Sequence, residues 1–128
     1  MSSRVLIVDP HADIVDLLRR ALELGGYEVE TASSTAGANA QMERHDFPVA
    51  LVNLTLPDGD GLRLLQLLKG RDPSIEVIVM TGCSPSNSTV VDATAQGAFH
   101  FLFKPFDLDE MLTVVANAEL RRKLGGAE

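Results

Sequence analysis

The sequence predicts an α/β domain in which a doubly wound parallel sheet is covered by helices on both faces. Five short apolar runs alternate along the chain with five segments of helical periodicity, and this alternation is typical of such a sheet. The 128 residues are enough for one domain with its own core. Hydrophobic residues make up 45% of the chain and charged residues 23%, a composition that favours a compact fold over disorder.

The predicted strands are apolar runs, and four of the five are rich in Val, Ile, Leu or Phe. Such residues are favoured in buried parallel strands. The strands are expected at residues 4–9, 27–32, 49–53, 76–81 and 99–103.

The predicted helices fill the segments between these strands. The first carries one apolar stripe and ends at Gly25 and Gly26. The third carries five leucines and should be strongly buried. The helices are expected at residues 12–24, 35–44, 61–68, 88–96 and 107–123. Residues 1–123 should form the domain, and residues 124–128 should be a C-terminal tail or the start of a linker.

The charge and hydropathy of the chain exclude several classes of function. Eleven Lys and Arg against eighteen Asp and Glu give a formal charge of -7, which repels nucleic acid and anionic lipid. No apolar run approaches the roughly 20 residues that span a bilayer, and no signal peptide is expected before the first strand. The lone Cys83 has no partner for an internal disulfide, in agreement with a reducing compartment. We therefore expect a cytoplasmic protein with no direct contact to nucleic acid or membrane.

Four polar residues follow predicted strands and suggest a site. They are Asp9, Asn53, Thr81 and Lys104. In an open parallel sheet, ligands bind outside the carboxyl ends of the strands, where the strand order reverses. A carboxylate, an amide, a hydroxyl and an ammonium that converge there would form a polar site for an anion or a metal. No Gly-rich nucleotide motif and no nucleophile elbow is present.

Nearly the whole chain resembles the receiver domain of two-component response regulators. The resemblance rests on Val-Leu-Ile-Val-Asp at 5–9, Leu-Pro-Asp-Gly-Asp-Gly at 56–61, Val-Met-Thr at 79–81 and Phe-Lys-Pro-Phe at 103–106. It implies a flavodoxin-like (βα)5 fold with strand order 2-1-3-4-5. In that family an aspartate at the end of the third strand accepts phosphate and holds a divalent cation together with two acids after the first strand. Thr81 and Lys104 match the groups that grip the phosphoryl oxygens, and the Lys104-Pro105 bond resembles the family's cis peptide.

The sequence departs from the family pattern at two positions of this pocket. Asn53 stands where the phosphate-accepting aspartate is expected, and an amide oxygen is a poor nucleophile. Pro10 replaces one of the paired acids and leaves Asp9 as a weak or vestigial metal ligand. One carboxylate remains where the family has three, and hard cations prefer charged oxygen ligands. Mg²⁺ binding should therefore be weak or absent, and no cofactor should be required.

Two further differences fall on the switching residues that the resemblance implies. Phe101 occupies the place of an aromatic switch without a hydroxyl, and it lies near Pro105. The stretch after Thr81 is one residue longer than the common spacing, with the insertion expected in the loop of Ser84, Pro85 and Ser86. We expect these residues to be held in one conformation.

Structural roles stay open beside the functional ones. Asp9 can cap the first helix or pair with Lys104, Lys104 can bond Asn53 or Asp9, and Thr81 can satisfy backbone groups at its strand end. Asp58 and Asp60 are expected for the turn they occupy. The scattered His11, His45 and His100 are expected at the surface or at an edge.

The leading hypothesis is a pseudo-receiver: an interaction and regulatory module that is not an enzyme and works without aspartate phosphorylation. The partner is expected to be a histidine kinase or another regulator, bound through helix 88–96, strand 99–103 and helix 107–123. The alternative is a receiver phosphorylated on a surrogate acid, with slow self-dephosphorylation. A weaker third reading is a pocket for a small anion at Lys104 and Thr81, and homodimerisation stays open.

Overall fold

The protein folds around a five-stranded parallel sheet, seen in a computed structural model that describes residues 3–82 and 87–126. The strands are β1 (Arg4–Val8), β2 (Glu28–Ala32), β3 (Val49–Asn53), β6 (Glu76–Thr81) and β7 (Ala98–Phe103), in the spatial order β2-β1-β3-β6-β7. Counted along the chain among these five, this is the 2-1-3-4-5 order, so the predicted fold class is confirmed. A two-stranded antiparallel ribbon of β4 (Thr55–Leu56) and β5 (Gly59–Asp60) was not predicted.

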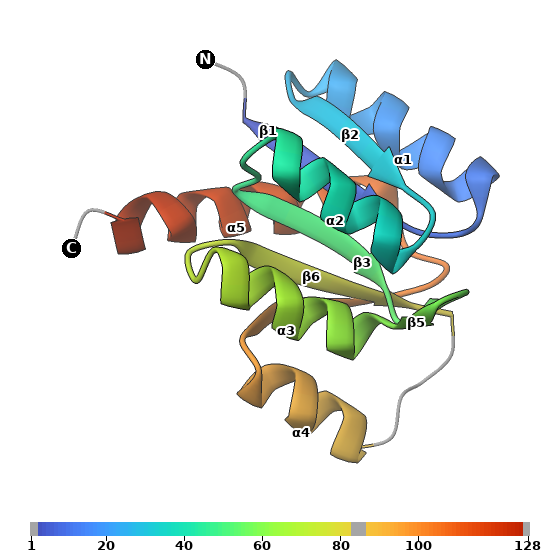
Figure 1. Cartoon of the computed structure of the whole chain (residues 1–128). Helices are drawn as coiled ribbons and strands as arrows, with labels where there is room; N and C mark the ends of the chain where they lie inside the picture. Colours follow the sequence, from blue (N-terminus) through green and yellow to red (C-terminus); the bar gives the residue numbers. More distant parts are fainter. Residues whose placement is uncertain (1–2, 83–86, 127–128) are drawn as a thin grey trace.

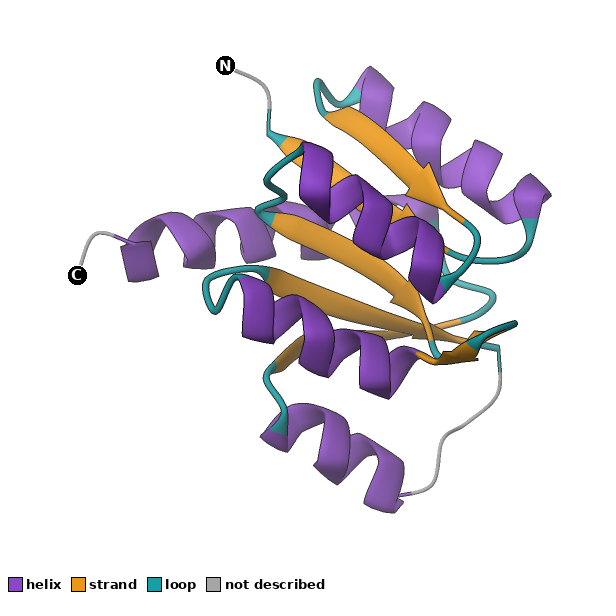
Figure 2. Cartoon of the chain, in the orientation of Figure 1, coloured by secondary structure: helices purple, strands orange, loops and turns teal. Residues whose placement is uncertain are grey.

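Helices cover both faces of the sheet, as Figures 1 and 2 show. On one face lie α1 (Ala12–Leu24) and α5 (Leu108–Gly126), and on the other lie α2 (Thr35–Arg44), α3 (Gly61–Arg71) and α4 (Asn87–Ala95). Each predicted helix is present. The bounds of α1 and α2 match the prediction, and the bounds of the other three differ by one to three residues at one or both ends.

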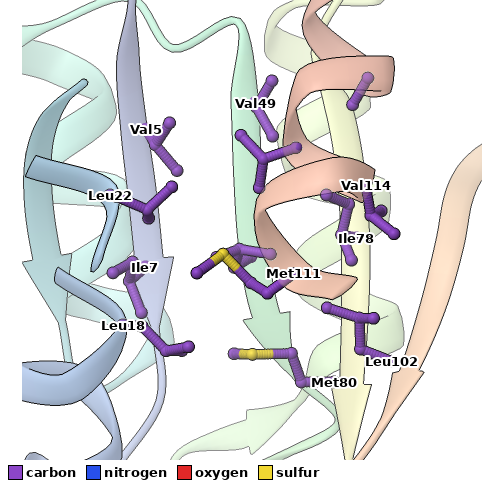
Figure 3. Packing of buried hydrophobic residues seen from close by; sticks show 13 residues of the cluster. Val5, Ile7, Leu18, Leu22, Val49, Ile78, Met80, Leu102, Met111 and Val114 are labelled. Atoms are coloured by element: carbon purple, nitrogen blue, oxygen red, sulfur yellow. The ribbon is translucent and has the colours of Figure 1, made fainter. Parts of the chain in front are cut away.

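The two faces of the sheet build two hydrophobic cores. Successive residues of a strand point to opposite faces, so Val5 and Ile7 join α1 and α5 while Leu6 and Val8 join α2, α3 and α4. Figure 3 shows the first core. Full burial of one such side chain contributes about 1.5–3 kcal/mol, and this burial holds the strand ends in fixed register.

Local signals explain where the helices begin and end. The hydroxyl of Ser34 accepts from the Gly37 N–H at the start of α2, and Asp60 accepts from the Arg63 N–H at the start of α3. Helix α3 runs past residue 68, its predicted end, because the Asp72 N–H still bonds the Leu68 carbonyl. The following Pro73 favours extended backbone at Asp72 and ends the helix there.

Helix α5 extends to Gly126, three residues beyond its predicted end. The segment expected to be a tail therefore begins within this helix. Glycine lowers helix stability by about 1 kcal/mol relative to Ala, which is not enough to stop a helix that already has a long packed body. Within the part of the chain that the structure describes, no helix is both long and apolar enough to cross a membrane.

Candidate functional site

The site lies at the carboxyl ends of β1, β3, β6 and β7, where the sequence placed it. Asp9, Asn53 and Thr81 are nearly buried, with 1%, 5% and 3% of their surface exposed. The Lys104 ammonium donates to Asp9 Oδ2 at 2.7 Å and to Asn53 Oδ1 at 3.0 Å. Both of the bonds considered for Lys104 from the sequence are therefore present at once.

The position of Lys104 is fixed by the backbone around it. Its N–H donates to the Thr81 carbonyl oxygen at 2.7 Å, which ties the end of β7 to the end of β6. The Lys104-Pro105 peptide bond is cis, as the resemblance implied. The lysine thus reaches into the pocket from a junction that is tied to its neighbouring strand.

Asn53 uses both ends of its side-chain amide. Its Oδ1 accepts from Lys104, and its Nδ2 donates to the Thr55 carbonyl oxygen at 2.7 Å. A lysine can only donate and a carbonyl can only accept, so these partners define the orientation of the amide. A carboxylate at this position could accept from Lys104 but could not donate to Thr55. Asparagine is therefore specifically suited to this hydrogen-bond pattern.

Both carboxylate oxygens of Asp9 have hydrogen-bond partners within the protein. Its Oδ2 bonds Lys104, and its Oδ1 accepts from the His11 N–H at 2.9 Å and lies 2.8 Å from the imidazole Nδ1. His11 was expected at the surface, and its side chain is indeed 59% exposed. Its contact with Asp9 was missed. The available signal was the Asp at a strand end followed two residues later by His, a spacing at which aspartate commonly bonds the backbone N–H.

The residues present do not fit a Mg²⁺ ion. Among the described residues, Asp9 is the one carboxylate that contacts Lys104, and its charge is matched by the Lys104 ammonium. Its oxygens and Asn53 Oδ1 accept from protein donors, and Pro10 offers no side-chain oxygen. Across residues 3–82 and 87–126, no group of three His, Cys, Asp or Glu side chains could hold a metal. A hard divalent cation would have to displace the lysine and would find one carboxylate.

The loop after β3 is held tightly against the site. The Leu54 N–H donates to the Met80 carbonyl at 2.8 Å, and the Gly61 N–H donates to the Leu54 carbonyl at 2.6 Å. A Cβ added to Gly61 would lie 2.5 Å from the Asn53 backbone oxygen. Only glycine permits this approach without movement of the backbone.

Asp58 and Asp60 have defined structural roles in this loop. Asp58 accepts from the N–H groups of Thr35 and Ala36 at 2.8 and 3.1 Å, so it binds the start of α2 from a distant loop. These two backbone hydrogen bonds, the one from Thr35 first, lower the pKa of Asp58. Asp60 caps α3. The predicted turn roles hold, and the contact of Asp58 with α2 was missed.

The predicted switch residues are only partly described. Phe101 is half-buried against the core under α2, α3 and α4, and its ring stacks on Phe103 with centroids 6.3 Å apart. Phe103 is 50% exposed. Pro105 is exposed beside the site. Ser84, Pro85 and Ser86 lie outside the described residues.

Comparison with known proteins places the chain in a family. The model of the response regulator receiver domain matches residues 5–116. The chain is 36% identical over 115 residues to the response regulator protein PilR of Pseudomonas aeruginosa, which covers 90% of this chain and 26% of PilR. It is 35% identical over 111 residues to the acid tolerance regulatory protein ActR of Rhizobium meliloti, which covers 87% of this chain and 57% of ActR. The chain thus spans about a quarter to a little over half of these relatives.

Solved structures agree with this placement. A CheY-like receiver domain protein of Methanospirillum hungatei superposes with a TM-score of 0.93 at 30% identity, covering 98% of this chain and 99% of that one. The beryllofluoride-activated NtrC4 receiver domain, a dimer, superposes with a TM-score of 0.87 at 35% identity, covering 93% and 98%. The chain belongs to the response regulator receiver domain family of two-component signalling.

Proposed function

We propose that this chain is a pseudo-receiver, a phosphorylation-independent interaction and regulatory module of a two-component system. The proposal is carried by the Lys104 ammonium, which bonds Asp9 at 2.7 Å and Asn53 at 3.0 Å. The resemblance gives this lysine the role of gripping phosphoryl oxygens, and here its ammonium is bonded to the acid and the amide of the pocket instead. The pocket is therefore filled and neutralised by the protein's own side chains.

The chemistry of position 53 supports the same reading. Phosphoryl transfer to a receiver needs a carboxylate nucleophile, and an amide oxygen is a poor one. The amide of Asn53 is also used at both ends by internal hydrogen bonds. We propose that the protein needs no cofactor, binds Mg²⁺ weakly or not at all, and does not act as an enzyme.

The partner surface that we propose consists of α4, β7 and α5. Apolar side chains are exposed on each of these elements, with Val91 64%, Phe103 50% and Leu120 55% exposed. Exposed apolar groups of this size mark interaction sites when they gather on one surface. A histidine kinase or another regulator in the cytoplasm is the partner we propose. The net charge of -7 speaks against direct binding to nucleic acid or membrane.

The alternative of a surrogate phosphate acceptor has less support. Asp58 and Asp60 are the acids nearest to Asn53 along the following loop. Each accepts backbone N–H groups at the start of a helix. An attack on phosphorus by either carboxylate would require the loss of these hydrogen bonds, which weaken its nucleophilicity.

Acetyl phosphate with Mg²⁺, followed by intact-mass measurement, tests the proposal. The native chain should gain no phosphoryl group. A variant with Asn53→Asp and Pro10→Asp, which restores two carboxylates to the pocket, serves as the positive control and should gain one. A phosphoryl adduct on the native chain would refute the proposal and identify the surrogate reading as correct.

A further inference from the structure

A cavity of about 400 Å³ lies between the first half of α1 and the segment that joins β7 to α5. Its two walls are far apart in the sequence, and Figure 1 shows the connection from β7 to α5 beside the start of α1. The apolar lining consists of Ile14, Leu17 and Leu18 from α1 and of Pro105, Phe106 and Leu108 from the opposite wall. The cavity is thus an apolar space next to the site rather than a part of it.

The walls of this cavity are held in place by the packed core. Leu18 is 1% exposed and points into the first core, where Figure 3 shows it. Ile14, Phe106 and Leu108 are partly buried against the same core. The N–H of Lys104 donates to the Thr81 carbonyl oxygen, which holds the opposite wall from its beginning. The cavity is therefore formed in advance, as most sites for small molecules are.

The size and the lining of the cavity suit a small apolar molecule. Sites for small molecules commonly have volumes of about 300–1,000 Å³ and mainly hydrophobic walls. A space of about 150 Å³ lined by such side chains already accepts benzene. At its rim, Leu17 is 54% exposed, so an occupant would also remove apolar surface from water, which is favourable.

The charges around the cavity favour a neutral occupant over an anion. Among the described residues that line it, Lys104 is the only charged one. The Lys104 ammonium already lies 2.7 Å from Asp9 Oδ2, so its charge is compensated inside the protein. An anion that entered would lose its hydration without gaining an unpaired cation, and that loss is costly.

We propose that this cavity binds a small, neutral, aromatic or alicyclic molecule. The occupant packs between Leu17 and Phe106 and contacts Lys104, the residue that bonds Asp9 and Asn53. Because it binds the folded chain and not the unfolded one, it stabilises the junction of β7 and α5. The inference goes beyond the proposed function and does not depend on whether position 53 can be phosphorylated.

Titration with two neutral ketones, acetophenone and cyclohexanone, tests the site by amide shifts in two-dimensional NMR. Each ketone should cause saturable shifts at Leu17, Gly82 and Phe106, which line the cavity. The Kd should be about 1 mM, the order expected for probes of this size. Benzoate has nearly the shape of acetophenone but carries a charge, and it should bind at least about tenfold more weakly.

Substitutions on α1 locate the binding. Leu17→Asp should raise the Kd for acetophenone about fivefold, because it puts a charge at an apolar wall. Leu17→Met keeps the apolar contact and should stay within about twofold of the native Kd. Leu24→Asp makes the same change on the same helix, at a residue that does not line the cavity, and should leave the Kd unchanged. Leu17 and Leu24 are 54% and 89% exposed, so these changes leave the core intact.

Three results would overturn the proposal. The first is the absence of saturable shifts with both ketones up to about 20 mM. The second is benzoate that binds as tightly as acetophenone, which would indicate an anion site at Lys104 instead. The third is an equal effect of Leu17→Asp and Leu24→Asp, which would indicate adsorption along the exposed side of α1, as for a protein partner, rather than binding in the cavity.

Discussion

Replacing Asn53 by aspartate should destabilise the fold, although it restores the residue type of the family. The carboxylate loses the Nδ2–H that donates to Thr55 and turns an oxygen toward that carbonyl at the same 2.7 Å separation. The lost hydrogen bond and the facing oxygens cost about 2 kcal/mol. Asp9, held through the same ammonium, adds about 1 kcal/mol of repulsion. The stronger, charge-assisted bond to Lys104 offsets about 1 kcal/mol.

The net loss of about 2 kcal/mol corresponds to a melting temperature lower by about 8 °C for a chain of this length. Thermal unfolding followed by circular dichroism in excess chelator measures it. Asn117→Asp makes the same chemical change at an exposed position of α5 and should shift the free energy of unfolding by less than about 0.5 kcal/mol.

The response to Mg²⁺ completes the test. With Asn53→Asp alone, Mg²⁺ should recover little of the lost stability. With Pro10→Asp added it should recover much of it, because the ion then gains a third carboxylate. An unchanged or raised melting temperature of Asn53→Asp in chelator would show that residue 53 neither donates to Thr55 nor lies beside Asp9. Full recovery without the change at Pro10 would show that the missing acid is not what limits the cation.

Three further predictions concern the same region. Lys104→Met should lower the free energy of unfolding in urea by about 3 kcal/mol, because it leaves the buried Asp9 carboxylate without its cation; adding Asp9→Asn should restore part of the loss, and additive effects would contradict the pairing. Gly61→Ala should cost about 2–3 kcal/mol by overpacking against the Asn53 backbone, and a variant of native stability would show that the loop is not held so closely. Asp58 has a lowered pKa, so its stabilising effect is present above its ordinary pKa and is lost as the pH falls through the lowered value; Asp58→Asn should therefore flatten the acid limb of a stability-against-pH curve, and an unchanged limb would contradict this.

Much of the fold could be predicted from periodicity because both faces of the sheet are covered. Strands buried on two sides are continuous apolar runs, whereas the helices between them carry apolar residues along one side only. The two-stranded ribbon after β3 has strands of only two residues each, too short to produce a period. The end of α5 was missed for another reason: Gly125 and Gly126 predict a helix end from local preference, and the packed helix before them overrides that preference.

The composition of the site was predictable, but its bonding was not. Strand ends meet at one edge of a parallel sheet, and that rule alone brings Asp9, Asn53 and Lys104 together. Whether Lys104 bonds one of its two acceptors or both, as it does, depends on distances of a few tenths of an ångström. The contact of Asp58 with the start of α2 joins residues 23 positions apart, so it depends on how the loop packs over the sheet. No local sequence pattern around either residue predicts such a contact.

The internal bonding of the pocket bears on how the protein can be regulated. On the proposal that Asn53 takes no phosphoryl group, no covalent event of the usual kind changes the charge beside Lys104. A partner can then change the surface of α4, β7 and α5 only through unequal affinity for two conformations. Moving a population from 1:99 to 99:1 takes about a 10⁴-fold difference in affinity, or roughly 5.5 kcal/mol.

The hydrogen bonds of Lys104 raise the difference in affinity that a partner must supply. Its N–H is bonded to Thr81 and its ammonium to Asp9 and Asn53, so a movement of the end of β7 must break or carry along all three bonds. Each hydrogen bond to a charged group contributes about 1.5–3 kcal/mol. A weakly binding partner cannot supply such a difference. This agrees with the proposed module, in which one fixed surface recognises the partners and regulation comes from which partner is present.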